Sequence, residues 1–146
     1  MSRLTVNEAG TSGYTDEIIL TPGDFTTAAG NTTTVVNFPV KAGDLIDACA
    51  LDVTEAFSVS SNITIGPDGT ADGAGADADG FIEADNCNAT GISVNTGDLL
   101  DDGGDAQNTV FKTDADGNIT ITASSALDVS TSGKMRVLFS VKRINF

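Results

Sequence analysis

Carboxylates are the most abundant reactive side chains in this sequence of 146 residues, which has 21 Asp and Glu, 7 Lys and Arg, and no His. Several of them lie in Gly-rich stretches that could form calcium loops. An EF-hand loop needs oxygen ligands at its first, third and fifth positions, Gly at the sixth and an acid at the twelfth. With Gly80 at the sixth position, Asn86 falls at the twelfth; with Gly117 there, Ala123 does. Neither stretch is an EF-hand.

Looser calcium sites on these loops stay open, because Ca²⁺ accepts varied oxygen cages. The same Asp-Gly pairs are also the chemistry of tight turns, in which Asp accepts hydrogen bonds from the following backbone. The sequence favours turns, and no metal ligand is assigned.

Catalysis has little to rest on in this composition. Paired carboxylates can cleave a glycosidic bond, and Asp16-Glu17 and Asp101-Asp102 are such neighbours, but chance alone produces pairs among 21 acids. The absence of His removes the commonest general base and the usual partner of a nucleophilic Ser or Cys. No G-x-S-x-G, phosphate-binding or C-x-x-C motif is present. We therefore expect no enzyme, no cofactor and no small-molecule substrate.

The two cysteines, Cys49 and Cys87, could form a disulfide bond, but their spacing cannot show it. Cys49 lies in an apolar alternation and is expected in the core, whereas Cys87 lies in a polar stretch between two Asn residues. Free thiols are favoured, because disulfides are rare in proteins that assemble in the cytosol.

The net charge of −14 bounds the partners. Such a charge repels phosphate backbones and anionic membranes, so neither a nucleic-acid nor a membrane partner is expected. The first residues have no apolar run typical of a signal peptide, and no stretch approaches the ~20 apolar residues that span a bilayer. Synthesis and folding in the cytoplasm are expected.

Four of the seven basic residues gather near the end of the chain: Lys134, Arg136, Lys142 and Arg143. One interpretation is a contact with an acidic neighbour, including another copy of the chain. The other is an edge strand that Lys and Arg keep from aggregating. The sequence does not separate the two.

Period-two alternation dominates the elements that must position these groups. In residues 44–54 the pattern places Leu45, Cys49, Leu51 and Val53 on one face, and Asp47 interrupts that face. Residues 134–142 alternate more regularly and predict one long strand with a single buried face. Shorter strands are predicted near residues 17–21, 35–40, 63–65, 92–94, 109–112 and 119–121.

Many short strands separated by turn residues predict an all-β fold, a β-sandwich or barrel. No repeat or linker is found, so residues 1–146 are expected to form one domain, with residues 1–15 as a candidate N-terminal arm. Residues 66–80 consist mainly of Gly, Ala and Asp and are expected to form a long exposed, mobile loop.

The order of several short motifs resembles the small head decoration, or cement, proteins of tailed phages. The pieces are Lys41-Ala42-Gly43-Asp44 before a strand, then Val53-Thr54-Glu55-Ala56-Phe57, Ile63-Thr64-Ile65-Gly66 and Asp79-Gly80-Phe81. The likeness spans most of the chain and rests on order and spacing. The stretch 66–80 and the strongly acidic balance depart from the family pattern.

The resemblance implies a jelly-roll-like β-sandwich that forms homotrimers on the outer surface of the capsid. There it would bridge neighbouring major capsid proteins through many weak contacts that symmetry repeats, and it would not act as a catalyst. The contact residues expected from the N-terminal arm, the segment around Tyr14 and the basic terminal strand are Arg3, Leu4, Val6, Tyr14, Lys134, Arg136, Lys142 and Arg143.

Two alternatives stay open. The first is a virion component associated with the tail or a fibre, although no repeat or stalk is present. The second is a β-sandwich module that binds carbohydrate or matrix through calcium in the Asp-rich loops. Tyr14 is the only Tyr and Trp is absent, which leaves a sugar few aromatic rings to stack on.

Overall fold

The computed structural model describes residues 3–5, 14–25, 33–100 and 110–143. These residues form strands and two short 3₁₀ turns, and among them there is no helix long and apolar enough to cross a membrane. The elements, in chain order, are β1 (Arg3–Thr5), β2 (Asp16–Leu20), η1 (Pro22–Asp24), β3 (Thr34–Val40), β4 (Leu45–Glu55), β5 (Asn62–Pro67), β6 (Ile82–Asn86), β7 (Gly91–Val94), β8 (Phe111–Lys112), β9 (Gly117–Ala123), η2 (Leu127–Val129) and β10 (Lys134–Lys142).

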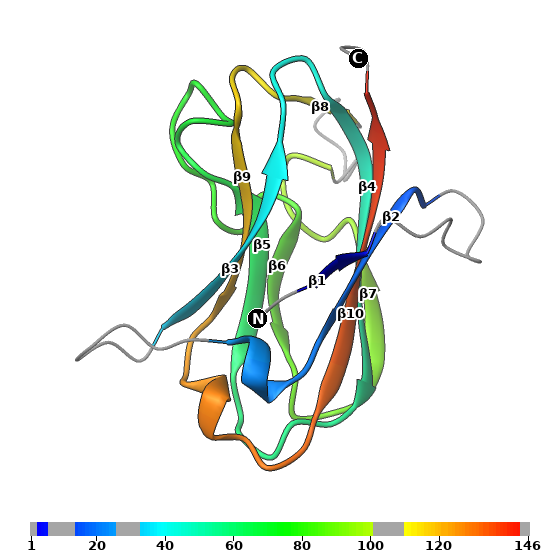
Figure 1. Ribbon diagram of the computed structural model, residues 1–146, viewed down its shortest axis with the longest axis vertical. Coiled ribbons are helices and arrows are strands. Elements are labelled where there is room, and N and C mark those ends of the chain that lie inside the picture. Colours follow the sequence, from blue (N-terminus) through cyan, green and yellow to red (C-terminus); the bar gives the residue numbers. More distant parts are fainter. Residues whose placement is uncertain (1–2, 6–13, 26–32, 101–109, 144–146) are drawn as a thin grey trace.

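The strands form two antiparallel sheets that pack face to face (Figure 1). Sheet A has the order β1-β2-β10-β4-β7, with β8 also paired to β4, and sheet B has the order β3-β9-β5-β6. The pairs β2–β10, β3–β9, β4–β7 and β5–β6 are those of one long hairpin, folded over so that successive pairs alternate between the sheets. This is the strand order of a jelly roll. The predicted all-β sandwich is confirmed.

The core lies between the sheets and follows the predicted alternation. In β9, Ile119, Ile121 and Ala123 are buried, while the residues between them are half-exposed. The ring of Phe38 in sheet B meets the ring of Phe139 in sheet A, with 4.5 Å between centroids. These rings pack against each other between the two sheets. Burying apolar surface there gives most of the stabilisation.

The predicted inner face of β4 is correct at Cys49, Leu51 and Val53 and wrong at Leu45. The pairing with β10 shifts by one residue between Ala48 and Ile46, so that Asp47 has no opposite residue. This β-bulge reverses which side chains face the core at the beginning of β4. Ile46 enters the core instead, and Leu45 is only half-buried.

Two other expectations need correction. Strand β10 is not an edge strand, because it lies between β2 and β4, and Leu138 on its second face is also buried. The segment 66–80 was expected to be exposed, but part of it is buried. It is the turn of the rolled hairpin, and Ala71 within it is fully buried in the core.

Candidate functional site

The basic residues of β10 are neutralised within their own sheet. Arg136 lies on the outer face of sheet A, where its Nε donates to Asp52 Oδ2 at 2.7 Å and its Nη1 lies 3.6 Å from Glu17 Oε2. The hydrogen bond to Asp52 raises the pKa of the guanidinium. The acidic neighbours that the sequence suggested for this residue are therefore the two flanking strands, β4 and β2.

The same holds for the two cations that follow. Lys142 Nζ lies 3.2 Å from Asp47 Oδ2, and Arg143 Nη2 lies 2.5 Å from Oδ2 of the buried Asp16. Lys134, by contrast, is exposed and makes no ion pair within the described residues. Three of the four terminal cations are thus already paired within the chain, and a partner would have to compete for them.

The remaining contact candidates lie toward the N-terminus. Arg3 and Leu4 belong to β1, which pairs with β2 at the edge of sheet A, and Val6 lies outside the described residues. Tyr14 is half-buried just before β2; burial raises the pKa of its hydroxyl, and the nearby Cys49 adds to the effect. Backbone register places Arg3 of β1 and Arg136 of β10 on either side of Ile19 in β2.

The aspartates of the loops act as turn residues, as the sequence favoured. Asp68 Oδ1 accepts the backbone N–H groups of Thr70 and Ala71, at 3.1 and 2.8 Å. Backbone N–H groups also donate, at 2.8 to 3.0 Å, to the carboxylates of Asp24, Asp44, Asp72, Asp114 and Asp116. The bonds to Asp24, Asp44, Asp68 and Asp72 are local and fix turns. Asp114 and Asp116 accept from Gly73 and Ala42 and thus join two loops that are far apart in the sequence.

One acidic cluster lies in the segment 66–80. The pKa of Asp77 is raised by burial, by a hydrogen bond with Asp79 and by the charges of Asp79, Asp72 and Asp98. Repulsion among like charges explains the direction. Within the described residues, however, no group of three or more acidic or cysteine side chains has a spacing that could hold a metal ion.

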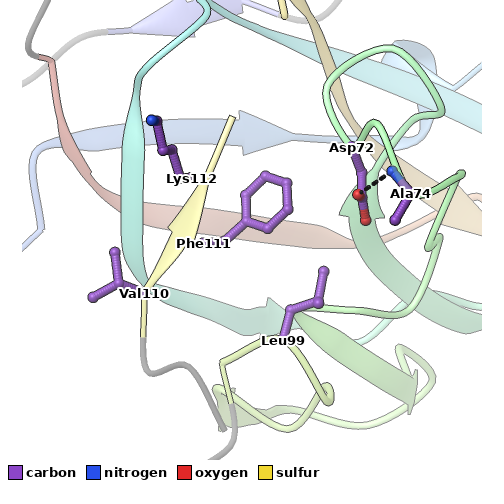
Figure 2. A pocket seen from close by; sticks show the side chains of 6 residues that line it. All are labelled: Asp72, Ala74, Leu99, Val110, Phe111 and Lys112. Atoms are coloured by element: carbon purple, nitrogen blue, oxygen red, sulfur yellow. Dashed lines mark hydrogen bonds between the residues drawn. The ribbon is translucent and has the colours of Figure 1, made fainter. Parts of the chain in front are cut away.

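A hollow of about 440 Å³ opens beside this cluster, lined by Asp72, Ala74, Leu99, Val110, Phe111 and Lys112. Figure 2 shows the Phe111 ring pointing toward Asp72, whose carboxylate accepts the Ala74 N–H at 3.0 Å. Val110 and Lys112 point away from the ring (Figure 2). The charged groups of the hollow are Lys112 and Asp72, and the Asp72 carboxylate already caps a turn; the other lining residues are apolar.

The two thiols are free and buried. Cys49 lies in β4 as expected, and burial raises its pKa well above the ordinary value. Cys87 is also fully buried despite its polar neighbours, because the Cys87 N–H donates to Ser61 and its carbonyl accepts from Phe57. Neither environment is that of a reactive thiolate.

The most distinctive surface is one that the sequence did not single out. The residues of β3, β5 and β9 that point away from the core carry no charge, and we call the face that they form the uncharged face: Val35, Asn37, Pro39, Asn62, Thr64, Asn118, Thr120 and Thr122. A carboxylate borders it at Asn118, whose side chain donates to Asp68 Oδ2 at 3.5 Å. All eight are exposed or half-exposed. Register places Val35, Thr122 and Thr64 side by side in one row.

The signal for this face was present in the sequence as the outward residues of Asn-Ile-Thr-Ile at 62–65 and 118–121. Only the pairing of both strands in sheet B shows that these residues adjoin. In a chain with a net charge of −14, a neutral face across three neighbouring strands is a surface that an acidic partner can approach with little repulsion. No family model and no curated protein matches this sequence.

Proposed function

We propose that this chain is a non-catalytic structural protein of a phage particle, which binds the outer surface of the capsid and joins neighbouring major capsid proteins. The observation that carries the proposal is the uncharged face of sheet B. Flat contacts between proteins are depleted in charged side chains at their centre. Thr and Asn side chains there supply hydrogen bonds without the cost of burying an ion.

The use of the charged groups supports a contact role over a catalytic one. Six loop aspartates accept backbone N–H groups, four within their own turn and two from another loop, and three of the terminal cations are paired. A catalytic acid or base needs a free position beside a substrate. These groups instead stiffen the sandwich, which suits a protein that must hold a shape on a shell.

The fold is compatible with this role but does not decide it. Jelly rolls occur in capsid and lectin domains, and a fold shared by several functions is only an analogy. The motifs that resemble decoration proteins have structural roles in this chain. The Lys41 N–H donates to Asp44 Oδ2 to close a turn in which Gly43 has a φ of +88°, and Phe57 and Phe81 are buried. The resemblance is thus carried by fold-forming residues.

In this proposal, attachment to the shell is repeated at every equivalent position, so weak individual contacts suffice. The homotrimer implied by the resemblance belongs to the same proposal. It would place several uncharged faces on one shell at once, and the avidity gained would offset a small area per face.

The experiment is a mixing test with purified expanded and unexpanded shells of the cognate phage. Co-sedimentation with expanded shells, and a higher temperature of shell rupture when the protein is bound, are the expected results. Binding to isolated tails instead of shells would favour a tail-associated protein. Absence of binding to both would overturn the proposal.

A further inference from the structure

Strand β7 lies at the edge of sheet A and has one unpaired side. It pairs with β4 through Gly91 to Val94, and within the described residues no strand pairs with its other side. The Asn95 N–H donates to the Cys49 carbonyl at 3.0 Å. Because backbone groups alternate in direction along an antiparallel strand, Ser93 and Gly91 also face β4. The N–H and C=O groups of Ile92 and Val94 therefore point outward.

The side chains of this edge are as unprotected as its backbone. Ile92 is 62% exposed and Val94 is 45% exposed, and β7 carries no charged residue. Natural proteins usually guard such an edge with Lys, Pro or a bulge, because a free edge is a template for another strand. Although the chain has 21 acidic residues, none of them lies in β7.

We propose that the β7 edge is a self-association site, at which β7 of a second copy adds antiparallel to form one continuous sheet. One two-fold register uses the outward-pointing groups of both residues: Ile92 pairs with Val94 of the other copy, and Ser93 lies on the axis. A two-fold contact requires one surface to complement itself. This register meets the requirement, because it brings four aliphatic side chains together on one face of the joined sheet.

A second copy suits this edge because its own β7 presents the same neutral side chains and the same outward-pointing backbone groups. Ile92 and Val94 lie in register with Asp52 and Ala50 of β4, so the new aliphatic cluster forms on the outer face of sheet A, where Arg136 already neutralises Asp52. Acidic groups still lie close by, since Ser93 Oγ donates to Asp85 Oδ2 at 2.8 Å. Two copies bring two such carboxylates near the axis, so salt should strengthen the contact by screening them.

The contact is small, so association should be weak and visible only at high protein concentration. One short strand and two aliphatic side chains per copy bury well below the roughly 800 Å² per partner of a standard interface. The site is separate from the uncharged face and does not rest on the proposed function. Shell binding can fail while β7 pairing holds, and the reverse.

The test is sedimentation equilibrium of the full chain from ~10 µM to ~1 mM in low and high NaCl, a range that brackets weak association. The mass of wild type should rise from 14.8 kDa toward twice that value, and more steeply in high salt. Ile92→Lys should weaken association about tenfold or more, because each copy loses one aliphatic side chain from the cluster and the two lysines lie diagonally across the axis. Val129→Lys, at a 67% exposed position in η2, is the matched control and should behave as wild type.

Hydrogen exchange distinguishes strand addition from any other contact. The amides of Ile92 and Val94 should exchange more slowly at high than at low protein concentration, while equal unfolding curves show that the variants are folded. A protein that stays monomeric throughout overturns the proposal. So does an oligomer, two-fold or three-fold, that Ile92→Lys leaves intact or that forms without protection of these two amides.

Discussion

Arg136 in β10 joins the strands on either side of it, with its Nε 2.7 Å from Asp52 Oδ2 in β4 and its Nη1 3.6 Å from Glu17 Oε2 in β2. All three side chains are largely or partly covered, so solvent screens them less than it screens an exposed pair. Removing the cation would leave two carboxylates facing each other across the sheet.

Arg136→Gln should therefore lower the free energy of unfolding by about 1–2 kcal/mol at pH 7, since each carboxylate loses a charged partner. Urea unfolding at low salt measures the change. Lys134→Gln is the matched control on the same strand and should stay within about 0.5 kcal/mol of wild type, because Lys134 is exposed and makes no ion pair in the described chain. Equal losses in both variants would contradict the cross-strand role of Arg136.

Gly133→Ala should be among the most damaging small substitutions. Gly133 has a φ of +128°, and a Cβ there would lie 2.3 Å from Cγ of the buried Phe57 ring. Both strain and the clash predict a loss of about 2–4 kcal/mol in unfolding free energy. Gly23→Ala, where a Cβ meets nothing within 4 Å, should cost less than about 1 kcal/mol. A tolerated Gly133→Ala would show that β10 begins differently.

Asp68 should contribute to the loss of stability in acid. Burial raises the pKa of its carboxyl, but hydrogen bonds from the backbone of Ala71, Asn118 and Thr70 outweigh it, so the folded pKa lies below the ordinary 3.8. Its contribution is present above that ordinary value and disappears as pH falls through the lower folded pKa.

Asp68→Asn should consequently flatten the decline in unfolding free energy between about pH 5 and pH 2. At pH 7 it should cost about 1–2 kcal/mol through weaker hydrogen bonds. Glu83→Gln serves as the control, because this exposed side chain accepts no backbone N–H in the described structure. If both variants keep the acid slope of wild type, Asp68 does not hold the turn as the distances indicate.

The contribution of Asp77 to stability should change with pH in the opposite direction to that of Asp68. Its pKa is raised by burial and by Asp79, Asp72 and Asp98, so its ionised form is disfavoured in the fold. Stability from this group is complete below the unfolded pKa and declines as pH rises through the folded one. Asp77→Asn should then stabilise the protein at pH 7 by a few tenths to about 1 kcal/mol, and not at about pH 3.

The same variant examines calcium directly. Thermal unfolding is measured with EDTA and with CaCl₂ for wild type and Asp77→Asn. We expect the variant to be the more stable in both solutions. Stabilisation of wild type alone by CaCl₂ would show instead that the Asp77 cluster binds the ion.

The thiols should be silent in the native state. Burial raises the pKa of both Cys49 and Cys87, which lowers the fraction of reactive thiolate. A colorimetric thiol reagent should react slowly with folded protein at pH 8 and release two equivalents per chain in urea. Rapid labelling of one equivalent without denaturant would show that the Cys87 turn opens readily.

The sequence predicted most strands because alternation is local, and what it missed depends on long-range pairing. Residues 119–121 and 134–142 were recognisable from their Ile, Val and Phe positions alone. The bulge at Asp47, which exchanges Leu45 for Ile46 in the core, arises only when β4 meets β10. The position of β10 between two acidic strands is likewise a property of the sheet order.

The candidate surfaces show the same division. The basic terminal residues are conspicuous in the sequence, yet Arg136, Lys142 and Arg143 find their acidic partners on neighbouring strands. The neutral residues Thr64 and Thr122 attract no notice until they stand side by side in sheet B. Absence of charge on a face is a property of several strands together.

The most direct measurement is the binding of Thr122→Lys to expanded shells by quantitative co-sedimentation. Thr122 lies in the middle of the uncharged face and its side chain makes no hydrogen bond in the described structure, so the variant should fold as wild type. Thr90→Lys, at an exposed position between β6 and β7, adds the same charge elsewhere. The account predicts that Thr122→Lys binds at least about tenfold more weakly than wild type, because a buried unpaired charge is costly. Thr90→Lys should bind as tightly as wild type. Equal affinity of the two variants for the shells would contradict it. So would the absence of binding by wild type and both variants.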